Sequence, residues 1–153
     1  MDPHVASAQY LLNQAVEDLG RSIDGLSADG LNWRPAGGDT NSVAVLTVHA
    51  MSSTRWWLSA AMGAPLPGRD RDSEFEASAP DASALLAWLE DIAKQCRTLL
   101  DTQDAVDWGA LRRRDADGPE LTSAWALVHA LSHLREHEGQ MSLTRQLWDA
   151  RQH

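Results

Sequence analysis

Apolar residues recur at steps of three and four in four separate stretches of this 153-residue sequence, the spacing of amphipathic helices. The stretches cover roughly residues 5–25, 40–62, 81–100 and 120–148, and no segment between them shows the alternation of a convincing strand. Each predicted helix is apolar on one side only, so the four sides are best buried against one another. The sequence therefore predicts an all-α four-helix bundle, in a single domain spanning residues 1–153.

Segments rich in proline, glycine and charge connect the predicted helices. They cover residues 27–39, 63–77 and 104–119, and the third contains the turn-forming run Asp115-Ala116-Asp117-Gly118. Before the third helix, Ser78 to Asp81 resembles a capping box with aspartate in place of the usual glutamate. We expect the two longer surface loops, 63–77 and 104–119, to select the substrate.

The charge balance excludes two classes of partner. With 22 acidic and 13 basic side chains the net charge is −9, whereas sequence-independent binding of nucleic acid or an anionic membrane needs a basic surface. No apolar run approaches the roughly 20 residues of a membrane span, and the N-terminus lacks a signal-peptide pattern. We expect a cytoplasmic protein with a small-molecule substrate. Cys96 is the only cysteine, and a half-buried residue is a better interpretation than a nucleophile.

Four of the six histidines carry the strongest functional signal, because His4 and His153 lie at the chain ends. His129, His133 and His137 follow at four-residue steps and share one helical face, and His49 lies near the middle of the second helix. Imidazoles from two neighbouring helices can hold one divalent metal with coordination positions left open. Spacing alone leaves a second interpretation, a stripe of hydrogen-bonded histidines. Met141 stands where a zinc-protease helix beginning at His137 would need its second histidine, so that class is excluded.

The residues around the histidines form two longer motifs. Residues 133–140 read His-Leu-Arg-Glu-His-Glu-Gly-Gln, and residues 31–35 read Leu-Asn-Trp-Arg-Pro ahead of Asn41-Ser42 and His49. Together they resemble the last helix, first loop and second helix of the DinB/YfiT-like family, in the same order and over nearly the whole chain. One departure is Thr54, where an acidic residue often precedes the paired aromatics of the family.

The resemblance implies a bundle that binds one divalent metal, usually zinc or nickel, through His49, His133 and His137. The family includes S-transferases that use mycothiol or bacillithiol, and a mycothiol-dependent isomerase. The resemblance thus implies an enzyme that transfers a low-molecular-weight thiol to an electrophile. Two alternatives stay open: a hydrolase that uses metal-bound hydroxide, and a non-catalytic, stress-related bundle whose metal is structural.

Several other residues are candidates to support a ligand or line a substrate pocket. Gln140 lies one turn beyond His137 and could orient that ligand or donate to a substrate. His129 could support a ligand, act as an alternative ligand or be a plain helix residue, and the last is our interpretation. Trp56 and Trp148 could wall a pocket, although core packing is the commoner role.

The last candidates are charged. Arg34 and Arg145 could bind a carboxylate of a thiol cofactor or simply face solvent. No residue stands out as a general base, so the catalytic residues are not assigned. We expect a homodimer, because small bundles of this kind often pair through a helical face.

Overall fold

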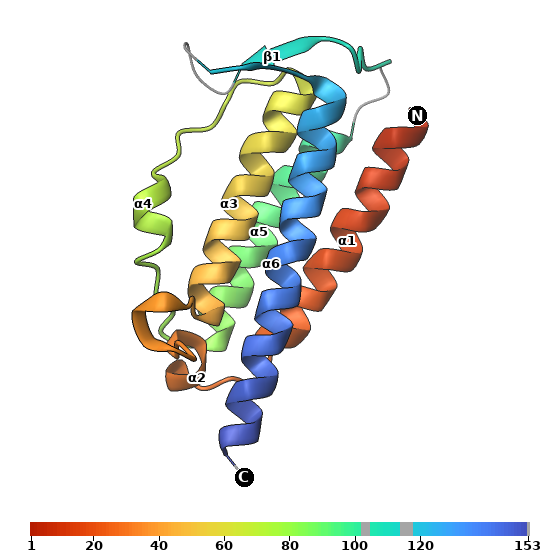
Figure 1. The fold of residues 1–153 in the computed structure, drawn as a ribbon. Coiled ribbons are helices and arrows are strands. Elements are labelled where there is room, and N and C mark those ends of the chain that lie inside the picture. Colours follow the sequence, from red (N-terminus) through yellow and green to blue (C-terminus); the bar gives the residue numbers. More distant parts are fainter. Residues whose placement is uncertain (102–104, 114–117, 153) are drawn as a thin grey trace.

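The computed structural model describes residues 1–101, 105–113 and 118–152, and within these ranges it confirms the predicted all-α bundle. The long helices α1, α3, α5 and α6 lie side by side (Figure 1). The elements in chain order are α1 (Pro3–Ile23), α2 (Ala28–Asn32), a 3-10 helix η1 (Gly37–Asp39), α3 (Val43–Met62), α4 (Arg71–Glu74), α5 (Ala82–Leu100), β1 (Leu111–Arg113), β2 (Glu120–Thr122) and α6 (Ser123–Arg151).

The direction of the helices determines where the second connection must run. Helices α3 and α5 are packed neighbours that run the same way, whereas α1 and α6 run the opposite way (Figure 1). The chain therefore has to return along the whole bundle between the end of α3 and the start of α5. On this return path it forms α4, which packs against α3. The predicted surface loop 63–77 is thus a crossover that covers α3.

Side-chain caps fix where each long helix begins. Asp2, Ser42, Asp81 and Thr122 each accept a hydrogen bond from the backbone N–H three residues further on, at 3.4, 3.2, 2.8 and 3.1 Å. Such a cap contributes about 1 kcal/mol to helix stability. The second and fourth helices therefore begin at Val43 and Ser123, a few residues later than predicted.

The predicted capping box from Ser78 to Asp81 is wrong, because Asp81 is itself the N-cap of α5. Ala79 is held outside the helix by Asn32, whose side-chain oxygen accepts from Ala79 N at 2.9 Å and whose amide donates to Ala79 O at 2.8 Å. This pair of hydrogen bonds ties the first connection to the start of α5.

The core lies between the four long helices, and α3 is its centre. The largest fully buried side chains include Leu12, Leu19, Met51, Leu58 and Leu134. The expectation of one apolar side per helix fails for α3, which is buried on nearly every side because α5, α6 and the crossover cover it. Within the described ranges, no helix has the length and apolar character needed to cross a membrane.

A small hairpin corrects the prediction that the chain has no strand. Strands β1 and β2 pair antiparallel, with Arg112 opposite Leu121, across the end of the bundle (Figure 1). Three residues are too few to show an alternating pattern, so neither strand could be predicted from the sequence. Arg112 donates from Nε to Ala60 O at 2.9 Å, which fastens the hairpin to α3. Residues 115–117 of the predicted turn lie outside the described residues, as does His153.

Candidate metal centre

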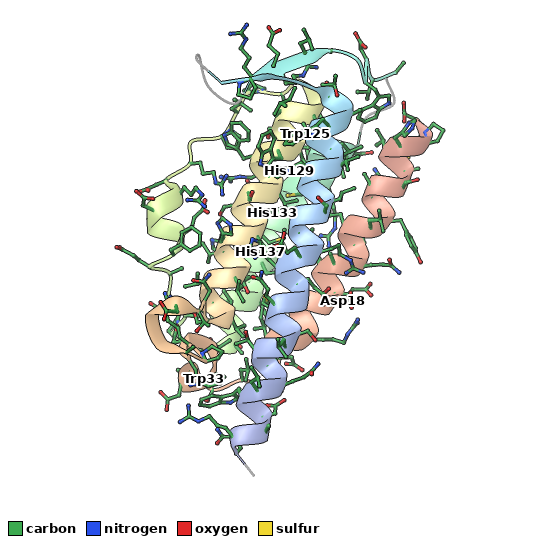
Figure 2. The ribbon with its side chains drawn as sticks, in the orientation of Figure 1. Asp18, Trp33, Trp125, His129, His133 and His137 are labelled. Carbon is green, nitrogen blue, oxygen red and sulfur yellow. The ribbon has the colours of Figure 1, made fainter. Side chains whose placement is uncertain are left out.

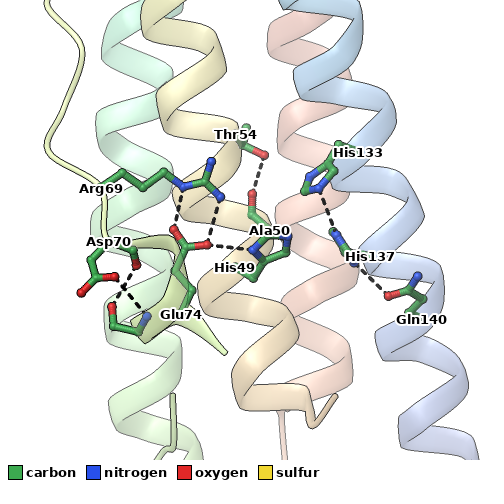
Figure 3. Close-up of polar contacts among 10 residues, drawn as sticks. His49, Ala50, Thr54, Arg69, Asp70, Glu74, His133, His137 and Gln140 are labelled. Atoms are coloured by element: carbon green, nitrogen blue, oxygen red, sulfur yellow. Dashed lines mark hydrogen bonds and ion pairs between the residues drawn. The ribbon is translucent and has the colours of Figure 1, made fainter. Parts of the chain in front are cut away.

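Three of the histidines meet where the middle of α3 faces α6. His49 comes from α3, and His133 and His137 come from α6, on the side of that helix that faces α3 (Figures 2 and 3). The ring centroids lie 5.1 Å apart for His49 and His133, 4.8 Å for His49 and His137, and 4.4 Å for His133 and His137. One ring nitrogen from each lies within 4.8 Å of the others, so the group could hold a metal ion.

The geometry of α6 brings two of these rings together without help from another element. Residues four apart lie on one helical face, and the Nε2 atoms of His133 and His137 are 3.1 Å apart. His49 is 4% exposed, whereas the two histidines of α6 are half-buried. The cluster is therefore closed on the α3 side and more accessible on the α6 side.

A buried ion pair supports His49. The Glu74 carboxylate lies 2.7 Å from His49 Nδ1, and Arg69 donates to the same carboxylate from Nε at 2.7 Å and from Nη2 at 2.9 Å (Figure 3). A carboxylate at this distance accepts the Nδ1 proton, which leaves Nε2 unprotonated with its lone pair free for a metal. Carboxylate–histidine–metal arrangements of this kind fix the tautomer and orientation of a ligand.

Gln140 supports His137 in a similar way, from the same helix. Its side-chain oxygen lies 2.8 Å from His137 Nδ1 and accepts that proton (Figure 3). Gln140 is exposed, unlike Glu74, which is 4% exposed. Among the described residues, His133 Nδ1 is buried without a hydrogen-bond partner. The three candidate ligands therefore differ in how firmly they are held.

The surroundings favour neutral imidazoles, the form that binds metals. Burial lowers the pKa of His133 to about 4, and repulsion from the neighbouring histidines and Arg69 adds to the shift. Burial also lowers the pKa of His49, although the contacts with Glu74 oppose the shift. Three imidazole nitrogen donors lie within 4.8 Å of one another, so the residues present fit a divalent transition metal.

An open cavity of about 630 Å³ is lined by two of the three candidate ligands, His49 and His133. Its lining residues come from α3, the crossover and α6: His49, Ser53, Trp56, Trp57, Arg69, Arg71, His129 and His133. Trp56, a candidate from sequence, is thus both buried and part of the wall. A small molecule in this cavity would lie beside the candidate ligands, as a catalytic site requires and a closed structural site does not.

His129 takes part in an aromatic cluster outside the three-histidine group. Its ring stacks on Trp125 at 4.7 Å with an interplanar angle of 8°, and meets Trp57 edge-on at 4.7 Å. Its centroid is 5.6 Å from that of His133 (Figure 2). Trp148, the other tryptophan considered, packs on Trp33 at 5.6 Å and does not line the cavity.

The two arginines chosen from the sequence make structural hydrogen bonds. Arg34 donates to the backbone oxygens of Thr40 and Phe75, both at 2.8 Å, and so joins the first connection to the crossover. Arg145 donates to the backbone oxygen of Asp24 at 2.7 Å, just beyond the end of α1. Neither lines the cavity beside the histidines.

The crossover supplies three residues that the sequence reasoning did not single out, Arg69, Arg71 and Glu74. Six consecutive positions there, 69–74, are charged or polar, and no pattern within them identifies which carboxylate is buried. The one local signal is Asp70, which accepts from Ser73 N at 3.2 Å and begins the short helix that carries Glu74 inward.

Fold and site together define a helical bundle with a candidate three-histidine metal centre beside an open cavity. The family model of the DinB superfamily matches residues 11–141, and the chain belongs to that superfamily. A solved structure of a conserved protein from Enterococcus faecalis is similar in fold. It aligns with a TM-score of 0.76 and 17% sequence identity over 96% of this chain and 97% of that one. No curated protein matches the chain.

Proposed function

We propose that this protein is a metal-dependent enzyme that transfers a low-molecular-weight thiol, of the mycothiol or bacillithiol class, to a small electrophile. The observation that carries the proposal is the convergence of three imidazole nitrogens, two of which, those of His49 and His133, belong to residues that line an open cavity. Membership of the DinB superfamily is consistent with it.

His49, His133 and His137 would hold the metal, for which zinc and nickel are the leading candidates because both accept imidazole ligands. A bound divalent ion supplies a Lewis acid that lowers the pKa of a thiol or water placed beside it. Glu74 and Gln140 keep the Nδ1 protons of His49 and His137 in place, so that Nε2 of each stays free of a proton. Trp56 and Trp57 wall the space for the electrophile.

The distribution of carboxylates favours a thiol over water as the nucleophile. Among the described residues no carboxylate lines the cavity, and both Glu74 oxygens are engaged by Arg69 and His49. A thiol with a pKa near 8.5 gives up its proton far more readily than water with a pKa near 15.7. In the proposed reaction sulfur forms a bond to the electrophilic carbon, the leaving group departs with its electron pair, and the thiol proton passes to solvent.

The first experiment measures metal content in natively purified wild-type protein and in the His133→Ala/His137→Ala double variant. We expect about one equivalent of a transition metal in the wild type and none in the variant. Loaded wild-type protein should then transfer mycothiol or bacillithiol to a haloaromatic faster than His49→Ala does. Metal binding without transfer of either thiol would contradict the transferase proposal, and hydrolysis of ester probes under the same conditions would favour a hydrolase.

A further inference from the structure

The cavity beside the histidines is positively charged, although the protein as a whole is acidic. Two guanidinium groups, those of Arg69 and Arg71, line it, and none of its lining residues is acidic. The chain carries a net charge of −9. A basic, partly enclosed surface on an acidic protein concentrates anions at that one place.

The two arginines differ in whether their charge is already compensated. Arg69 forms two hydrogen bonds to the buried Glu74 carboxylate, so that pair is close to neutral. Within the described ranges no carboxylate pairs with Arg71. Its neighbour Asp70 instead caps α4 by accepting from Ser73 N. Arg71 is therefore the uncompensated charge of the cavity.

Arg71 is an exposed residue whose guanidinium lies over an aromatic ring. Its guanidinium carbon lies 5.1 Å from the centroid of the Phe75 ring, and that ring lies 4.6 Å from the ring of His49. A guanidinium stacked on an aromatic face keeps its N–H groups at its edge, where they are free to bind a carboxylate. One aromatic ring thus separates this anion-binding group from a candidate metal ligand.

The remaining walls suit a flat apolar group. Trp56 and Trp57 meet edge-to-face, with ring centroids 4.8 Å apart and an interplanar angle of 81°, and both line the cavity. Trp56 is 9% and Trp57 8% exposed, so their positions are fixed by packing. Aromatic walls of this kind bind planar rings through offset or edge-to-face contacts.

We propose that the cavity binds a planar anion, an aryl or similarly conjugated carboxylate, whose carboxylate pairs with Arg71 and whose ring packs on Trp56 and Trp57. This inference rests on the proposed function for the role of the bound molecule as the electrophilic substrate, but not for the binding itself. It names the substrate class that the thiol-transfer proposal leaves open.

The test is a binding measurement that needs no turnover. Isothermal titration calorimetry compares 4-nitrobenzoate with the neutral isostere 4-nitrobenzamide, on metal-loaded protein and on protein treated with a chelator. The variants are Arg71→Met and, as a matched control, Arg21→Met, which removes the same charge from an exposed position on α1. Arg71→Lys tests whether a positive charge without the planar guanidinium group is enough to bind the carboxylate.

We expect 4-nitrobenzoate to bind wild type and Arg21→Met equally, and Arg71→Met at least about tenfold more weakly, as the loss of one charge-assisted hydrogen bond implies. Arg71→Lys should recover part of the affinity, and 4-nitrobenzamide should bind weakly to all. Equal binding of the two probes, or equal affinity in Arg71→Met and Arg21→Met, overturns the proposal. Binding that survives in Arg71→Met but vanishes without metal also overturns it, because the carboxylate would then lie on the metal. If the benzoate binds as expected and no thiol transfer occurs, only the proposed function fails.

Discussion

His133 and His137 lie one turn apart on the same face of α6, so the pitch of that helix brings their rings together. On the facing helix, His49 depends on a carboxylate from a different element. Glu74 of α4 contacts His49 Nδ1 at 2.7 Å, and Arg69 holds that carboxylate in turn. One side of the candidate metal centre is thus organised by local structure, and the other by a crossover that spans the bundle.

This difference shows where the site is sensitive to mutation. Glu74 is 4% exposed and its partner Arg69 is largely buried, so removing one charge leaves the other without compensation. Gln140, which supports His137, is exposed and can be replaced by water. We therefore expect substitutions on the α3 side to cost both stability and metal affinity, and substitutions on the α6 side to cost affinity alone.

The largest effect is expected for Glu74→Ala. It leaves the Arg69 guanidinium without a counter-charge and His49 Nδ1 without an acceptor, which should lower the free energy of unfolding by about 3–5 kcal/mol. Loss of a residue that orients a ligand should weaken metal binding by roughly 10–100-fold. Urea unfolding and competition with a chelator measure the two effects. Glu76→Ala, at an exposed position of the same segment, is the control, and equal behaviour of the two variants would disprove a special role for Glu74.

Acid should destabilise the metal-free protein through His133. The pKa of His133 is about 4 in the folded chain, below the ordinary 6.5, so between these values the unfolded chain binds a proton that the folded chain does not. This contribution to stability is complete above about pH 6.5 and is lost as the pH falls towards 4. We expect about 2 kcal/mol less stability at pH 5 than at pH 7 in chelator-treated wild type. In His133→Gln, the free energy of unfolding measured in urea should depend less steeply on pH. An unchanged pH dependence would contradict the lowered pKa of His133.

A smaller effect is expected for Gln140→Ala. His137 loses the acceptor of its Nδ1 proton, but water can take over at an exposed position, so metal affinity should fall by no more than about tenfold. The free energy of unfolding should change by less than about 0.5 kcal/mol, as is usual for surface positions. The chelator competition used for Glu74 measures the affinity, with Gln146→Ala of the same helix as control. If metal affinity fell as far in Gln140→Ala as in Glu74→Ala, the expected difference between the α6 side and the α3 side of the site would be disproved.

The smallest effect is expected at Cys96, because this residue of α5 is packed in the core and is not part of the candidate metal centre. The thiol is fully buried, rather than half-buried as predicted, and burial raises its pKa to about 12. Iodoacetamide at pH 8 should leave it unmodified in the native protein and alkylate it in urea, since only the thiolate reacts. Mass spectrometry follows the modification, and rapid alkylation of native protein would show that α5 opens.

The sequence by itself determined the elements that depend on near neighbours in the chain. Apolar spacing predicts the four long helices. Their first residues are fixed by capping side chains such as those of Ser42 and Thr122, each of which accepts a hydrogen bond from the backbone N–H three residues further on. The pairing of His133 with His137 could be predicted for the same reason, because residues one helical turn apart lie on the same face. The place of His49 opposite them was suggested by family resemblance, and the packing of α3 on α6 brings the three residues together.

Only the tertiary structure decided which charged residues serve the site. Arg34 and Arg145, chosen from the sequence, bind backbone oxygens, whereas Glu74 of the crossover contacts His49 and Arg71 of the same segment lines the cavity beside it. The physical reason is the parallel course of α3 and α5, which forces the connecting chain back along α3 (Figure 1), where its Glu74 contacts His49. A carboxylate 25 residues away in sequence becomes a neighbour through that path, and no local pattern records it.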